Sequence, residues 1–145
     1  MRAPTALPKA VLVLDVVGAR AALSAGPVLL LSAEGAAGTI GPLFWRALVD
    51  QAAEGWPVLN ALCCADEPGH ALAALRAGCR RLVLDGAHPS FAQVSSAAAE
   101  MGAVLLQARP PALDLRGIDL RRDAGRAIVS RWLAMEPDDI HDGLR

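Results

Sequence analysis

The chain is predicted to be an α/β domain with a five-stranded, mainly parallel sheet and flanking helices. Three observations support this fold class: short continuous apolar runs recur, segments with helical periodicity separate them, and glycine or proline stands at many of the joints. Such runs are typical of buried parallel strands, whose crossover connections are usually helices. At 145 residues the chain fits a single domain, which we place at residues 1–136, followed by an acidic, flexible tail at 137–145.

Five apolar runs are the expected strands. Each run is short, rich in Val, Leu or Ala, and bounded by polar residues, glycine or proline. The runs lie at residues 10–15, 28–32, 58–64, 82–85 and 103–107.

The first two helices are expected between these runs, the first at 17–25. Pro42 opens the second helix, because proline fits the first helical position. The inner face of this helix is predicted from apolar residues at helical spacing, which are Trp45, Leu48, Val49, Ala52 and Trp56.

The remaining helices are marked by their ends. Asp66 is the expected N-cap of the third helix, and Gly78 ends it. Ser90 is the expected N-cap of the fourth. An irregular loop is expected at 110–117, where two prolines break the pattern, and a last helix at 120–135.

Two arrangements of these elements satisfy the pattern. One is a partial barrel of the TIM type, since a complete eight-stranded barrel needs about 250 residues. The other is a flavodoxin-like three-layer sheet with helices on both faces.

Charge and composition exclude several classes of partner. The formal net charge is −1 and arginine is interspersed with acid, whereas a nucleic-acid-binding protein shows a concentrated basic surface. No apolar run approaches the length of about 18 residues that a membrane span needs. The three cysteines are an odd number without disulfide spacing, so we expect a cytoplasmic protein.

The apolar content favours association. Hydrophobic residues make up 54% of the chain, which is high for a domain with only five expected strands. A partial barrel leaves apolar edges that need cover. We therefore expect a homo-oligomer or a protein partner.

Polar residues at the carboxyl ends of the expected strands form the candidate site. Ligands of parallel α/β sheets bind at this edge. A purely structural interpretation also fits, since strand ends meet solvent and Asp66 and Ser90 are expected caps. The residues of this edge are Asp15, Ser32, Glu34, Cys64, Asp66, Asp85, His88 and Arg109.

A glycine-rich loop adds a second candidate. Gly35, Gly38, Thr39 and Gly41 lie just before the second helix, where backbone N–H groups can bind a small anionic metabolite. The loop matches neither the dinucleotide-binding nor the P-loop pattern. A plain glycine turn is the alternative interpretation.

Asp85 and His88 are the candidate catalytic pair, as an acid/base couple at the end of the fourth strand. No metal or other cofactor is expected, because no two histidines lie at ligand spacing. Lys9, the only lysine, begins the first strand, at the end opposite the usual active edge of a barrel.

Two segments carry a family resemblance. Residues 27–37 follow the pattern Pro-Val-Leu-Leu-Leu-Ser-Ala-Glu-Gly-Ala-Ala, and residues 82–91 contain Asp85-Gly-Ala-His88 before Phe91. Residues 27–108 resemble half of a class II, zinc-dependent ketose-bisphosphate aldolase barrel. The resemblance implies a barrel-type fold with a site at the strand ends.

The chain departs from that family at the metal site. The family ends its third strand with His-x-Asp-His, which supplies a zinc ligand and the catalytic acid/base, whereas residues 61–64 here are Ala-Leu-Cys-Cys. The resemblance therefore implies a degenerate relative that lacks the metal-binding motif.

These observations lead to a functional prediction. We expect a non-catalytic, aldolase-barrel-like domain that self-associates or binds a partner or a small anionic metabolite. The alternative is a lyase or hydrolase that acts on a small phosphorylated or carbonyl substrate through Asp85 and His88.

Overall fold

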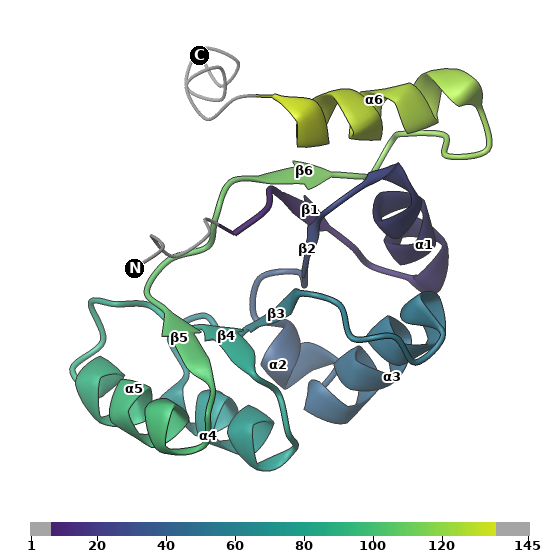
Figure 1. Ribbon diagram of the computed structural model, residues 1–145. Coiled ribbons are helices and arrows are strands. Elements are labelled where there is room, and N and C mark those ends of the chain that lie inside the picture. Colours follow the sequence, from purple (N-terminus) through teal and green to yellow (C-terminus); the bar gives the residue numbers. More distant parts are fainter. Residues whose placement is uncertain (1–6, 136–145) are drawn as a thin grey trace, which may run out of the picture.

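A six-stranded parallel sheet forms the centre of the protein in a computed structural model that describes residues 7–135 (Figure 1). The α/β class and the parallel sheet flanked by helices are confirmed. The predicted tail at 137–145 lies outside the described residues. The sheet order is β5-β4-β3-β2-β1-β6, and the strands are β1 Ala10–Leu12, β2 Leu29–Leu31, β3 Asn60–Cys63, β4 Arg81–Val83, β5 Val104–Leu106 and β6 Ala112–Asp114.

The sixth strand corrects the expected count of five. β6 lies within the segment predicted as an irregular loop and pairs in parallel with β1, with Ala112 opposite Ala10. Pro110 and Pro111 directly precede it. Proline cannot donate to a ladder but is tolerated before the first residue of an edge strand, so the two prolines mark the start of β6 and do not exclude it.

Six helices connect or follow the strands: α1 Val16–Ala25, α2 Ala36–Thr39, α3 Pro42–Ala53, α4 Pro68–Arg76, α5 Phe91–Glu100 and α6 Asp123–Ala134. The expected glycine loop contains the short helix α2. The N-cap of α4 is Glu67 and not Asp66, and it makes no side-chain capping bond. Ser90 is the N-cap of α5, also without such a bond. None of the described helices has the length and apolar character to cross a membrane.

The two faces of the sheet are covered differently. Alternate strand residues such as Val11, Leu30 and Leu62 pack with all six helices in one hydrophobic cluster. The opposite face forms a second cluster to which no described helix contributes, made of Ala10, Leu29, Leu31, Ala61, Cys63 and Val83, with Leu106 and Ala112 against it. The expectation of helices on both faces is therefore wrong for residues 7–135.

Curvature explains how a face without helices stays buried. Figure 1 shows the sheet as an arc with the helices on its outer side, and the 107–111 connection passing from β5 to β6 along the open side. The second cluster lies on the inner side, where Leu29, Leu31 and Ala61 have no accessible surface. The inner face thus packs largely against itself.

The three tryptophans have different environments. Trp45 on α3 is 1% exposed, and its indole N–H donates to Asn60 Oδ1 at 3.0 Å. Trp132 on α6 donates to the Ala10 carbonyl at 2.8 Å and so ties α6 to β1. Trp56 is 75% exposed, contrary to the predicted inner-face stripe, because α3 ends at Ala53 and Glu54 adopts a left-handed conformation.

Candidate functional site

A pocket of about 440 Å³ lies at the carboxyl ends of β2 to β5. This is the edge at which ligands of parallel sheets bind. Four of the residues predicted for this edge line the same cavity. The full lining is Glu34, Cys63, Ala65, Asp66, Val83, Asp85, Gln107, Ala108 and Arg109.

Backbone hydrogen bonds hold the loops of the pocket together. The Asp85 amide donates to the Ala65 carbonyl at 2.8 Å, and the Gly86 amide donates to the Gln107 carbonyl at 2.9 Å. A Cβ on Gly86 would lie 2.7 Å from Gln107 Cβ, so only glycine allows this approach. The loops after β3, β4 and β5 therefore form one connected wall.

Ala65 shows backbone strain at the pocket. Its φ of 52° lies in the left-handed region, which costs a non-glycine residue about 1–2 kcal/mol. The residue stands between the end of β3 and Asp66, and its carbonyl accepts the Asp85 amide. Strained residues of this kind concentrate at functional sites.

The cysteine that lines the pocket is Cys63 and not Cys64, which was predicted for this edge. Cys63 lines the pocket, whereas Cys64 belongs to the cluster on the helix side. Burial raises the pKa of the Cys64 thiol to about 12, so this thiol stays protonated near neutral pH. Successive strand residues face opposite sides of the sheet. The way β3 pairs in the sheet therefore decides which of the two cysteines faces the pocket.

His88 does not join Asp85 in the pocket lining. Its Nδ1 accepts the Ser90 amide at 3.0 Å, which uses the ring in the turn before α5. Asp85 Oδ1 accepts the Ala87 amide at 3.0 Å. Among the described residues no hydrogen bond or ion pair joins Asp85 to His88, so the expected acid/base couple is not assembled here.

The glycine loop lies apart from the pocket lining. Gly35 and Gly41 have φ of 70° and 83° and flank α2, which is only four residues long. A Cβ on Gly38 would meet the His70 ring at 2.5 Å, so this imidazole lies against Gly38. Thr39 is exposed. The structure gives these residues a turn-forming and packing role.

Asp15 has a structural role as well. Its Oδ1 accepts the Gly18 amide at 2.7 Å and caps α1. It lines a different, smaller pocket of about 300 Å³, together with Leu115 and Ile118. The Asp15 carboxylate thus serves as the N-cap of α1, a position at which a negative charge stabilises a helix.

The charged groups of the main pocket are mostly acidic. Glu34, Asp66 and Asp85 provide three carboxylates, and Arg109 provides the one guanidinium of the lining. Arg109 Nη1 already donates to the Ser32 carbonyl at 3.0 Å. Within residues 7–135 no three His, Cys, Asp or Glu side chains converge closely enough to hold a metal ion. The pocket is therefore formally negative and suits a ligand with a positive group.

Five of the nine lining residues were not predicted, and two of these five, Cys63 and Gln107, have side chains that can make polar contacts. Gln107 follows β5 directly, so the strand-end rule used for the other positions also predicts it. The sequence did not decide whether Cys63 or Cys64 faces the pocket, because it does not show which side of the sheet each residue of β3 faces.

Comparison of the chain with protein-family models, with curated proteins and with solved structures gives no match.

Proposed function

We propose that the protein is a non-catalytic, small-molecule-binding α/β domain, and that its ligand carries a positively charged group. The pocket at the carboxyl ends of β2 to β5 carries this proposal. Its lining combines three carboxylates with apolar side chains from the strand ends, and its volume of about 440 Å³ is within the range of small-molecule sites. This ligand class replaces the anionic metabolite expected from the glycine loop.

A binding function is favoured over catalysis by the use of the candidate groups. His88 accepts a backbone amide in the turn before α5 and is absent from the lining. Lys9 directly precedes β1, at the opposite end of the sheet. Among the described residues no hydrogen bond joins the thiol of Cys63 to a carboxylate of the lining, whereas acid/base or covalent catalysis needs a base within hydrogen-bond reach of a nucleophile.

The shape of the sheet supports a partial barrel over a flavodoxin-like fold. Strands β1 to β5 follow one another in sequence order, and all described helices pack on one side. The flavodoxin order 2-1-3-4-5 reverses direction at its ligand site. A barrel segment related to class II aldolases, in which residues 61–64 no longer provide a metal ligand, fits this arrangement.

The ligand class is tested with a simple cation. We expect 1,4-diaminobutane at millimolar concentration to shift the backbone NMR signals of residues 63–66, 85–86 and 107–109, and inorganic phosphate to leave them unchanged. The double substitution Asp66→Asn, Asp85→Asn should weaken diamine binding roughly tenfold, because two exposed charge interactions of up to about 1 kcal/mol are lost.

The controls separate pocket charge from overall charge. Asp50→Asn removes an exposed carboxylate on α3 outside the pocket and should leave the affinity unchanged. Equal weakening by Asp50→Asn would assign the effect to the overall charge. Larger shifts with phosphate than with the diamine, centred on residues 35–43, would restore the anion site and refute the proposal.

Self-association is the second candidate function. Ile40, Leu43 and Phe44 follow one another at helical spacing around the start of α3, and Leu43 and Phe44 are 70% and 58% exposed. Contiguous exposed apolar surface is typical of interaction sites. We place the contact between two copies at these three residues.

Sedimentation velocity at micromolar concentration tests this surface. We expect the protein to sediment as an oligomer and the double variant Leu43→Ser, Phe44→Ser to sediment as a monomer, because the apolar contact area is lost. Trp56→Ser changes an exposed apolar residue elsewhere and should leave the oligomer intact. A monomeric parent protein would remove this candidate.

A further inference from the structure

An interruption in the ladder between β2 and β3 lies at the edge of the pocket. The Ser32 amide donates to the Ala61 carbonyl at 3.1 Å. In a parallel ladder the next bond would run from the Cys63 amide to the Ser32 carbonyl. The Cys63 amide donates to Ser32 Oγ at 2.8 Å instead, and this hydroxyl donates to the Ala33 carbonyl at 3.0 Å.

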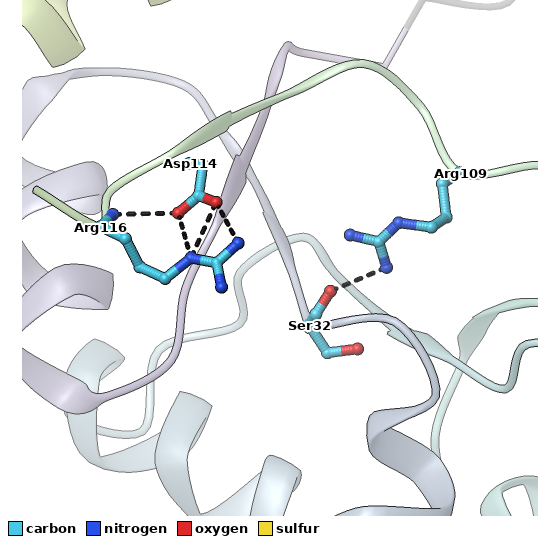
Figure 2. Close-up of polar contacts among 4 residues, drawn as sticks. All are labelled: Ser32, Arg109, Asp114 and Arg116. Carbon is cyan, nitrogen blue, oxygen red and sulfur yellow. Dashed lines mark hydrogen bonds and ion pairs between the residues drawn. The ribbon is translucent and has the colours of Figure 1, made fainter.

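The replacement leaves the Ser32 carbonyl without its ladder donor. Arg109 takes that place, since its Nη1 donates to the Ser32 carbonyl at 3.0 Å (Figure 2). Ser32 is 1% exposed, so its carbonyl needs a partner within the protein. The Ser32 side chain thus completes the ladder, and the Ser32 carbonyl accepts a hydrogen bond from the guanidinium of Arg109, 77 positions away in the sequence.

Arg109 belongs to the connection that crosses the open side of the curved sheet. This 107–111 segment joins β5 to β6, the two opposite edges of the sheet. Gln107, Ala108 and Arg109 form one wall of the pocket. At its start the segment is tied by the Gly86–Gln107 backbone bond, and two residues later by Arg109.

We propose that Ser32 and Arg109 are positioning residues of the pocket, which fix the 107–111 segment as its wall and shield the thiol of Cys63 beneath it. The proposal rests on the proposed function for its biological meaning, because the wall matters only if the pocket binds a ligand. Its physical content does not depend on the ligand: breaking the Arg109–Ser32 bond frees the segment and opens the inner face.

A second arginine close by provides the matched control. Arg116 pairs with Asp114 at the end of β6 (Figure 2), in an ion pair between residues two positions apart. Both side chains of this pair are substantially exposed, and it connects no distant segments. Loss of Arg116 therefore removes a similar charge from the same part of the chain without freeing the 107–111 segment.

The rate of thiol labelling reports whether the 107–111 segment still shields Cys63 from the reagent. All three cysteines are buried. Cys63 lies on the inner face and lines the pocket, whereas Cys64 and Cys79 belong to the cluster on the helix side. The folded protein is treated with N-ethylmaleimide, and the label on each cysteine is followed by fragmentation mass spectrometry. We expect Arg109→Met to accelerate labelling of Cys63 roughly tenfold, since a hydrogen bond to a charged group is lost, with Cys64 and Cys79 unchanged.

Two further variants test the role of Ser32. Ser32→Ala should also accelerate labelling of Cys63, because the Cys63 amide then competes with Arg109 for the main-chain carbonyl of residue 32 and weakens the Arg109 bond. Arg109→Lys keeps a donor and should restore most of the protection. The double variant Ser32→Ala, Arg109→Met should label no faster than the faster single variant, because both changes break one interaction.

Several outcomes would overturn the proposal. One is a Cys63 rate in Arg109→Met equal to that of the parent protein or of Arg116→Met. Another is equal acceleration at all three cysteines, which would show that Arg109 holds the whole fold and not one segment. Labelling uses no ligand, so a failed diamine titration with a positive labelling result would refute the ligand class and leave the positioning role in place.

Discussion

Trp45→Ala is expected to lower the free energy of unfolding by about 4 kcal/mol, as Trp-to-Ala changes in packed cores do. The side chain is 1% exposed and lies in the cluster between α3 and the sheet. Truncation leaves a cavity that the surrounding strands and helices can fill only in part. It also removes the indole N–H that donates a hydrogen bond to Asn60 Oδ1 at 3.0 Å. Urea denaturation followed by far-ultraviolet circular dichroism measures the loss.

Trp56→Ala is the matched control for that result. This side chain is 75% exposed and follows the end of α3, so its truncation should change the unfolding free energy by less than about 0.5 kcal/mol. The pair compares the same chemical change at a buried and an exposed position. Similar losses in the two variants, or a loss below about 1 kcal/mol for Trp45→Ala, would contradict the core assigned to α3.

The contrast between these two tryptophans shows how far periodicity predicts packing. The helical spacing correctly indicated Trp45, Leu48, Val49 and Ala52 as the inner face. It failed at Trp56 because the helix ends three residues earlier. Gly55 and Pro57 mark the neighbourhood of that end, but sequence patterns do not fix a helix boundary to one residue.

The sheet could be predicted in its class and in five of its strands, but not at the edge formed by β6. All five expected strands are short apolar runs between turn signals, and the structure places β1 to β5 within them, apart from Arg81 at the start of β4. β6 has only three residues, follows two prolines, and contains an aspartate. Its place depends on the exposed edge of β1, which is a long-range pairing without a local signal.

The covering of the sheet also depends on tertiary structure. A continuous apolar run requires that both faces of a strand be buried, and helices on both faces meet that requirement. A curved sheet whose inner face packs against itself meets it equally. The second cluster, with Leu29 and Leu31 fully buried, is of this kind. The apolar runs are the same in both cases, so the sequence leaves the choice open.

The sequence predicted which residues lie at the candidate site better than it predicted the role of each residue there. The strand-end rule brought together Glu34, Asp66, Asp85 and Arg109, because parallel strands end at one edge. Residue type gave no guide to what each group does there. Asp15 occupies the same edge but caps α1, which depends on a backbone geometry that the sequence shows only after the helix start is known.

Gly125→Ala is expected to destabilise the protein by roughly 2 kcal/mol, within the range of overpacked sites. The same change in an ordinary helix stabilises it by up to about 1 kcal/mol. Gly125 lies in the first turn of α6, and a Cβ there would stand 2.0 Å from the carbonyl oxygen of Asp119 and 2.7 Å from its carbon. Both are main-chain atoms, so the clash cannot be relieved by rotation of a side chain.

The loop that would have to move is itself held in place. The Asp119 carbonyl accepts the Arg122 amide at 3.2 Å, and Arg126 Nη1 donates to the Leu120 carbonyl at 3.0 Å. Gly125→Ala therefore either breaks these bonds or shifts α6, whose Trp132 is bonded to β1. Hydrogen exchange of the Trp132 indole reports that shift, and urea denaturation gives its free energy.

Gly69→Ala supplies the opposite expectation within the same chain. Gly69 is in the first turn of α4, its φ is not positive, and a Cβ there meets nothing within 4 Å. The alanine should stabilise the protein by about 0.5–1 kcal/mol through helix propensity. A stabilising Gly125→Ala would mean that the 118–122 loop does not pack on α6 as described. Two variants with the same sign would show that propensity, and not the contact with Asp119, decides the effect.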